Sequence, residues 1–243
     1  SDPNARPEEQ KLHYWTVEQF KSFSDAMISL IDEGMEKEGT AYNIQEAHGI
    51  YVFFNILFYA GLRREEANAL QVDDFHDGEH PYLNITKSVN MKNKVKGKYL
   101  VTLPKNKQSI RKVPIPSKLA ELIRFQIDYL KMNKDFQNNW FLCGGRNPIP
   151  DTTADVMKNE AEKRANLPHI RVHDLRHSYA SMLINKGVDI AIISRLMGHG
   201  SPQITYSIYS HFYPETNYKA VEGIDDKLEL NTKKEKEEEE MEM

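Results

Sequence analysis

Apolar residues recur with the period of an α-helix along most of the chain, and two early stretches also carry helix boundary signals. Thr16 and Gln19 have the spacing of a capping box ahead of an amphipathic run over 20–39. A second helix is expected over about 43–59, with Gly61 as its C-terminal stop. Both stretches therefore predict helices, the first of them amphipathic.

The most apolar run of the chain is IYVFFNILFYAGL, residues 50–62. It is shorter than the roughly 20 residues that a transmembrane helix needs, and it contains the polar residue Asn55. We therefore interpret it as a buried helix of a globular protein.

The pattern changes in the centre of the chain. Segments 82–89, 98–103 and 110–115 are short, rich in β-branched residues and separated by polar or glycine-containing turns. They predict a three-stranded antiparallel sheet, with the lysines of 90–98 at a hairpin tip. Helical periodicity continues elsewhere, and helices are expected over 64–70, 116–133, 152–165, 174–185, 189–196 and 202–211. The predicted fold class is mainly α with a small three-stranded antiparallel β-sheet.

Length and composition suggest one large domain, or one domain with appendages. The chain has 243 residues, of which 40% are apolar, enough to bury a sizeable core. Residues 1–12 are interpreted as a cloning remnant or linker, and 13–214 as the folded domain. Residues 215–243 form a C-terminal segment that ends in an acidic tail. Ser201 is the expected N-cap of the last helix, with Pro202 at its first position.

Charge is distributed unevenly, so the formal net charge of −4 does not exclude a polyanionic partner. Residues 84–112 contain nine Lys or Arg and no Asp or Glu. A basic stripe of this kind is typical of a nucleic-acid contact. The single cysteine, Cys143, rules out an internal disulfide and a four-cysteine zinc site, and it fits a reducing compartment.

The segment HDLRH, residues 173–177, contains the first candidate site. His173 and Arg176 lie three apart at the start of a predicted helix, and His177 lies four from His173. The segment superficially resembles the zinc motif HExxH, but Asp174 replaces the glutamate and Arg176 would place a fixed cation beside the metal. A cationic pair at a helix N-terminus suits a phosphate better.

Three further segments supply chemically useful residues. In GLRREE, Arg63 begins a helix and Glu66 is placed to hold it by a charge-assisted hydrogen bond. In TLPKNKQSIRKVPIP, Lys105 lies at a turn between two strands. In LMGHGSPQITYSIYSH, His199 lies in a glycine-flanked turn and Tyr209 follows ten residues later.

Together and in this order, these four segments resemble the catalytic domain of the tyrosine recombinases, most closely the integrases of phages and conjugative transposons. The resemblance covers about residues 15–214, so that 13–214 would be the catalytic domain. It implies that Glu66 supports Arg63. For the catalytic lysine it implies Lys105, with Lys107 as the alternative. The catalytic residues that it implies are Arg63, Lys105, His173, Arg176, His199 and Tyr209.

The reaction implied by the resemblance is a phosphodiester transfer without metal, ATP or another cofactor. The phenol of Tyr209 attacks a DNA phosphorus, leaving a 3′-phosphotyrosine and a free 5′ hydroxyl. His173 is the expected acceptor of the phenol proton. Arg63, Arg176 and His199 would hold the phosphate oxygens, and Lys105 would protonate the leaving oxygen.

The expected partner is double-stranded DNA at att-type sites, and the expected place is the bacterial cytoplasm, in association with the nucleoid. Relatives imply a homotetramer on DNA, a monomer when free, and an excisionase or DNA-bending accessory protein. The segment 213–230 would dock on a neighbouring subunit. The lysines expected to contact DNA phosphates are Lys92, Lys94, Lys96, Lys98 and Lys107.

Other interpretations remain open at this point. Segment 183–209 has the pattern of a helix–turn–helix, so a non-catalytic DNA-binding module is one alternative. A type IB topoisomerase-like enzyme would share the chemistry, and a zinc hydrolase is the last alternative. The residues interpreted as packing or as supports of the site are His177, Cys143, Tyr206 and His211.

Overall fold

The computed structural model of the chain describes residues 12–36, 44–95, 98–103 and 107–210. The helices are α1 (Val17–Glu36), α2 (Ile44–Ala60), α3 (Arg64–Ala69), α4 (Ser117–Lys131), α5 (Asp151–Arg164), α6 (Asp174–Asn185), α7 (Ile190–Met197) and α8 (Pro202–Tyr209). The strands are β1 (Phe75–His76), β2 (Tyr82–Ile85), β3 (Ser88–Val95), β4 (Lys98–Thr102) and β5 (Arg111–Pro114). Short 3₁₀ turns occur at Val72–Asp74 and Lys107–Ser109. The predicted class, mainly helical with small antiparallel sheets, is confirmed.

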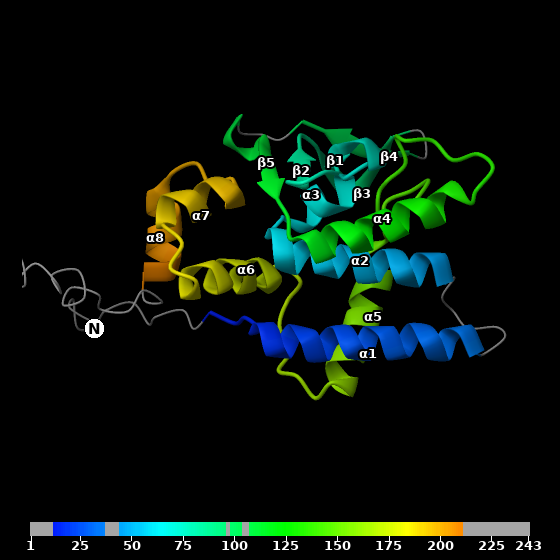
Figure 1. The fold of residues 1–243 in the computed structure, drawn as a ribbon, viewed down its shortest axis with the longest axis horizontal. Helices are drawn as coiled ribbons and strands as arrows, with labels where there is room; N and C mark the ends of the chain where they lie inside the picture. Colours follow the sequence, from blue (N-terminus) through cyan, green and yellow to red (C-terminus); the bar gives the residue numbers. More distant parts are fainter. Residues whose placement is uncertain (1–11, 37–43, 96–97, 104–106, 211–243) are drawn as a thin grey trace, which may run out of the picture.

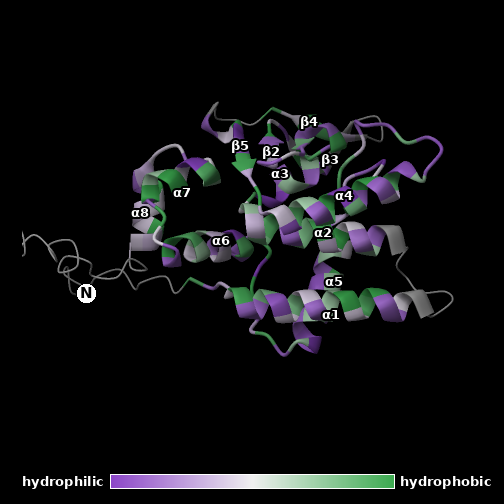
Figure 2. Cartoon of the chain, in the orientation of Figure 1, coloured by the Kyte–Doolittle hydropathy of each residue, from purple (hydrophilic) through white to green (hydrophobic). Residues whose placement is uncertain are grey.

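The N-terminus of α1 is the predicted capping box. The backbone N–H of Thr16 donates to Gln19 Oε1 at 2.9 Å, and the N–H of Gln19 donates to Thr16 Oγ1 at 3.2 Å. From this start, α1 packs against α2 and α5. Apolar and polar positions alternate around α1 and around α4, as Figure 2 shows, so each of these helices has one face for the core.

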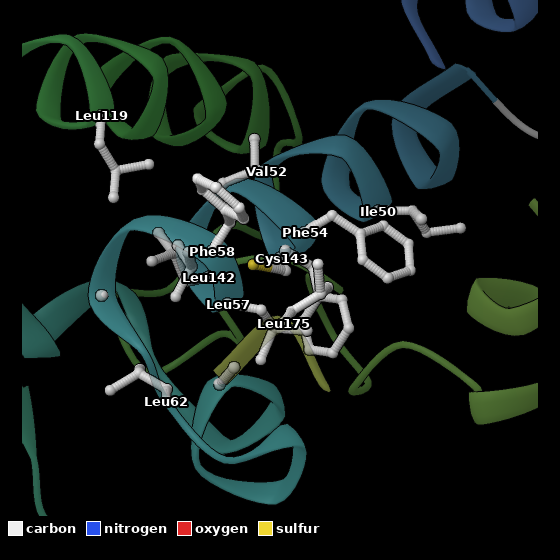
Figure 3. Close-up of a cluster of buried hydrophobic side chains, with 14 of the residues drawn as sticks. Ile50, Val52, Phe54, Leu57, Phe58, Leu62, Leu119, Leu142, Cys143 and Leu175 are labelled. Carbon is white, nitrogen blue, oxygen red and sulfur yellow. The ribbon is translucent and has the colours of Figure 1, made fainter. Parts of the chain in front are cut away.

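Helix α2 is the centre of the main core, because it packs against α1, α4 and α6. Ile50, Phe54 and Phe58 on this helix are fully buried. Figure 3 shows Cys143 among the apolar side chains of α2, and its burial raises the pKa of the thiol. Cys143 is therefore a packing residue, as expected. Among the helices of the described part of the chain, none is both long enough and apolar enough to cross a membrane.

The turn after α2 needs its glycine. Gly61 has φ +62°, a left-handed conformation that L side chains rarely adopt. A Cβ atom at this position would lie 2.1 Å from Cδ1 of Tyr179 on α6. The turn therefore brings the start of α3 close to α6, two elements that the sequence separates by about a hundred residues.

The strands are grouped differently from the prediction. Instead of one sheet, β1, β2 and β5 form a three-stranded sheet, while β3 and β4 form a separate hairpin. The predicted strand 82–89 is interrupted between β2 and β3, and Lys87 in the interruption pairs with buried Asp74 at 2.7 Å. Leu83 of β2 is aligned with Val113 of β5, which lets both residues reach the core. After the interruption, β3 packs against α3 instead.

The last three helices form a second apolar cluster. Figure 1 shows α6, α7 and α8 together at one end of the molecule. Buried residues from all three helices meet there, including Tyr179, Met197 and Tyr209. Pro202 begins α8 and Ser201 takes the N-cap position as predicted, although the Ser201 side chain makes no capping hydrogen bond.

Several predictions fall outside the described residues. Lys96, Lys105, His211 and the docking segment 213–230 lie there, as do residues 1–11 and the acidic tail. Lys92 and Lys94 lie on β3, Lys98 lies on β4, and Lys107 lies in the 3₁₀ turn before β5.

Candidate active site

Arg63 and Glu66 are joined at the N-terminus of α3. Arg63 is the N-cap residue, and its N–H donates to Glu66 Oε2 at 2.9 Å. Its guanidinium Nη1 donates to Glu66 Oε1, also at 2.9 Å. The hydrogen bond expected from the sequence is therefore present. Glu66 is buried, whereas the Arg63 side chain remains 35% exposed and available to a ligand.

A second arginine holds the same carboxylate, and the sequence analysis missed it. Arg111 on β5 is buried and donates to both Glu66 oxygens, at 3.1 and 3.0 Å. The sequence did contain an indication of this role. Arg111 lies two residues before the buried Val113 on the same strand, so both side chains point to the inward face. Arginine on the inward face of a strand implies a buried acceptor.

The C-terminus of α7 gathers three arginines from three other elements. Consecutive carbonyls at this helix end accept from three guanidinium groups: Leu196 O from Arg111 Nε at 2.6 Å, Met197 O from Arg176 Nη2 at 2.5 Å, and Gly198 O from Arg63 Nη2 at 3.4 Å. The last carbonyls of a helix lack partners within the helix and carry partial negative charge, so cations are favoured there. We call Arg63, Arg111 and Arg176 the arginine cluster.

Arg176 links this cluster to the turn after α2. Its Nη1 donates to Gly61 O at 2.7 Å, and the side chain is buried. Burial and the positive charge of Arg63 lower the pKa of Arg176 to about 9, so the guanidinium remains charged at neutral pH. Among the described residues, the carboxylate that accepts hydrogen bonds from this cluster is that of Glu66. The cluster therefore has excess positive charge and suits an anion such as phosphate.

Neutralising Glu66 should be costly. Burial alone would raise its pKa, but the hydrogen bonds and charges of Arg111 and Arg63 outweigh this and hold the pKa below its usual value. Because folding lowers this pKa, the carboxylate stabilises the protein above its unfolded pKa, and the contribution is lost as the pH falls through the folded pKa. Glu66→Gln should therefore lower the free energy of unfolding at pH 7 by about 3 kcal/mol.

Urea unfolding from pH 7 down to pH 3 measures this effect. The difference between wild type and Glu66→Gln should shrink as the pH falls, because the wild-type carboxylate becomes protonated. The matched control is Glu65→Gln, which removes an exposed carboxylate next to the site. Equal stabilities of wild type and Glu66→Gln at pH 7 would contradict the structural role of Glu66.

The two predicted histidines approach the cluster from different elements. His199 lies in the turn after α7, where Gly198 has φ +66°, and its Nδ1 is 2.7 Å from Thr205 Oγ1. Burial and the charge of Arg176 lower the pKa of His199 to about 4, so the ring is neutral at pH 7. Partial desolvation and the neighbouring Arg176 also lower the pKa of His173, the N-cap residue of α6.

Tyr209 on α8 is buried in the second apolar cluster, and its hydroxyl meets α6. Its side chain is 1% exposed, and its Oη lies 2.6 Å from Nδ1 of His177. Burial raises the pKa of Tyr209, and the charge of Arg176 opposes that rise. Tyr209 therefore contacts α6 at the residue that follows Arg176 of the arginine cluster. His177, interpreted from the sequence as a packing or supporting residue, makes a direct contact with the predicted nucleophile.

An open cleft lies between α3 and the β3–β4 hairpin. Its volume is about 590 Å³, and its lining residues include Arg63, Glu66, Asn90, Lys92 and Ser109. Lys92 is exposed there, so its ammonium group can contact a ligand that enters the cleft. Within the described ranges, no group of three His, Cys, Asp or Glu side chains is arranged to hold a metal ion.

Comparison with known proteins gives the class of this fold and site. The sequence model described as the phage integrase family matches residues 39–216. The chain belongs to this family, and the resemblance to tyrosine recombinases is confirmed.

Individual relatives fit this class. The chain is 31% identical over 232 residues to the ICEBs1 integrase of Bacillus subtilis (strain 168), covering 90% of this chain and 56% of the relative. It is 29% identical over 224 residues to a XerC-like tyrosine recombinase of Caldanaerobacter subterraneus subsp. tengcongensis, covering 86% and 54%. The chain thus spans about half the length of these curated relatives.

Solved structures show the same fold. The Tn1549 transposon integrase in complex with transposon right end DNA matches with a TM-score of 0.64 and 23% identity, over 91% of this chain and 68% of that one. The XerA recombinase matches with a TM-score of 0.58 and 20% identity, over 91% and 64%.

Proposed function

We propose that this chain is the catalytic part of a site-specific DNA recombinase that integrates and excises a mobile element. It would cut and rejoin DNA through a 3′-phosphotyrosine intermediate. The observation that carries this proposal is the arginine cluster on the C-terminus of α7, together with the position of Tyr209, whose hydroxyl lies 2.6 Å from Nδ1 of His177, the residue after Arg176 on α6. Membership of the phage integrase family and the likeness to an integrase solved with transposon DNA support it.

In this proposal the arginine cluster binds the scissile phosphate. Arg63 and Arg176 hold the non-bridging oxygens, whose charge grows in the pentavalent transition state, and a planar guanidinium matches that geometry. Arg111 is a positioning residue, because its donors are directed to Glu66 and to backbone carbonyls. His199 donates a further hydrogen bond to the same phosphate.

The reaction itself exchanges one phosphoester for another. Tyr209 Oη attacks the phosphorus, the bond to the 5′ oxygen breaks, and the protein remains joined to the 3′ phosphate. Lys105 is the proposed acid that protonates the 5′ oxygen. Because the bond energy is kept in the phosphotyrosine, a 5′ hydroxyl of the partner duplex can reverse the step without ATP. No metal ion is needed in this scheme, since guanidinium groups supply the positive charge.

The proposed substrate is double-stranded DNA with att-type sites. The cleft beside Arg63 and the basic stripe of β3 and β4 would follow the phosphate backbone, with Lys92 as an exposed cation among the cleft's described residues. Lys94, Lys96, Lys98 and Lys107 are proposed to extend this contact. We further propose a homotetramer on DNA that forms from monomers, with 213–230 docking on a neighbour. An excisionase or DNA-bending protein would assist it at the nucleoid of a bacterial cytoplasm.

A nicked suicide duplex tests this function. The duplex carries an end junction of the mobile element that encodes the chain, with a nick close to the cleavage position so that the released strand diffuses away. We expect an adduct that survives SDS and forms equally well in EDTA. Absence of any adduct on such junctions would favour the non-catalytic DNA-binding module, and loss of the adduct in EDTA would restore the metal-dependent alternative. Relaxation of supercoiled plasmid without strand exchange would indicate a topoisomerase.

A further inference from the structure

We propose that His177, rather than His173, accepts the proton of Tyr209 as its oxygen attacks the phosphorus. The inference rests on the proposed function and assigns one step of it. Its geometric basis is the 2.6 Å contact between Tyr209 Oη on α8 and His177 Nδ1 on α6. This distance is that of a short O–H···N hydrogen bond, within the reach that a general base requires.

The second ring nitrogen of His177 faces a buried carboxylate. His177 Nε2 lies 4.0 Å from Asp174 Oδ1, and Asp174 is 2% exposed. Arg171 holds this carboxylate in place through its backbone N–H and its guanidinium, each at 2.8 Å. We assign the phenol as the donor to Nδ1, so the neutral ring carries its proton on Nε2, the nitrogen on the side of Asp174. The negative charge of Asp174 would offset part of the cost of forming an imidazolium at His177.

His173 has a different environment. Its ring meets the ring of His177 edge to face, with centroids 5.5 Å apart. The ring contact of His173 is therefore with His177, and the contact with the Tyr209 hydroxyl is made by His177. As the N-cap residue of α6, His173 lies where a helix N-terminus favours an anion. The geometry assigns His173 to the phosphate and His177 to the phenol.

The charges around His177 keep it in the accepting form. Burial and the neighbouring His173 lower its pKa to about 4, with Arg171 and Arg176 acting in the same direction and Asp174 opposing them. The ring is consequently neutral at pH 7, and in the assigned tautomer Nδ1 can accept the phenol proton. Burial also raises the pKa of Tyr209, so no proton moves in the resting protein. Transfer occurs only as the Oη–P bond forms and the phenol becomes acidic.

The step balances in both directions. The Oη–P bond forms and the P–O5′ bond breaks, while the Oη proton passes to His177 Nδ1 and O5′ receives a proton from Lys105. In the joining step, the attacking 5′ hydroxyl returns its proton to Lys105, and His177 returns its proton to the departing Tyr209 oxygen. The proposal therefore needs no oxidant, metal or additional reactant.

The variant His177→Asn separates proton transfer from positioning. An asparagine amide can place a hydrogen-bond acceptor near the Nδ1 position but cannot take a proton at neutral pH. We expect the single-turnover rate of adduct formation on the nicked junction duplex to fall by about 10²–10⁴-fold. The remaining rate should rise with pH from about 6 to 9, since hydroxide then removes the phenol proton. The matched variant His173→Asn should lose rate without gaining this pH dependence.

A fluorinated tyrosine at position 209 provides a second test of the same proton transfer. Fluorination lowers the phenol pKa and so reduces the need for a base. Its introduction should restore the rate of His177→Asn by at least about tenfold relative to tyrosine, and should not do so for His173→Asn. A rate of His177→Asn within about threefold of wild type would overturn the inference, as would a loss of rate with neither the new pH dependence nor the recovery. If wild type forms no adduct, the proposed function fails first.

Discussion

Tyr209→Phe is expected to abolish the covalent protein–DNA adduct, with a loss of more than about 10⁴-fold in rate. Phenylalanine keeps the ring that packs among α6, α7 and α8 but lacks the oxygen that would attack the phosphorus. The fold should survive, because the ring packing is kept and the hydrogen bond to His177 is worth about 1 kcal/mol. The measurement is the fraction of suicide duplex that remains attached to protein in SDS.

The control for this experiment lies one helical turn away. Tyr206 is also on α8 but is 61% exposed, so Tyr206→Phe removes a phenol without touching the buried contact. This variant should form the adduct at the wild-type rate. An adduct that persists in Tyr209→Phe and disappears in Tyr206→Phe would mean that the nucleophile has been misassigned.

Arg63→Ala should give the second largest loss, about 10²–10³-fold in the rate of adduct formation. Its guanidinium is the partly exposed member of the arginine cluster, so it is the one positioned to meet a ligand from the cleft. Removing it leaves Glu66 paired with Arg111, which protects the folded state. Arg63→Lys should recover only part of the loss, because lysine keeps the charge but not the two-pronged donor.

Arg64→Ala is the matched control, since the two arginines are adjacent in sequence but have different partners. Arg64 pairs with Asp151 and Asp155 at the start of α5, at 2.8 and 2.9 Å. Its loss should lower stability slightly, because these carboxylates are partly exposed, and leave the rate within about threefold of wild type. Equal rates for Arg63→Ala and wild type, measured at saturating DNA, would exclude Arg63 from the phosphate site.

The parts of the fold that the sequence predicts are those set by local interactions. Helix periodicity places α6 at the expected residues, and the Thr16–Gln19 capping box appears with both of its hydrogen bonds. The grouping of strands was wrong in detail, because pairing of β2 with β5 depends on contacts across some 30 residues. β-branched composition predicts that a segment is extended, but not which neighbour it pairs with.

The candidate site divides in the same way. Glu66 could be predicted as the partner of Arg63, because a spacing of three residues at the start of a helix brings the two side chains together. The role of Arg111 could not, since it depends on β5 meeting the end of α7. Likewise, the His-x-x-Arg motif predicts His173 as a site residue. The contact of His177 with Tyr209 depends on how α8 packs on α6, which the motif does not predict.

In the proposed function, side chains from α3, α6 and α8 act on one DNA phosphorus, with Tyr209 as the nucleophile. The most direct measurement is peptide mapping of the trapped adduct by mass spectrometry after nuclease and protease digestion. We expect a nucleotide attached through its 3′ phosphate to the oxygen of Tyr209. Attachment to Tyr206, Tyr213 or any other residue, or linkage through a 5′ phosphate, would contradict it.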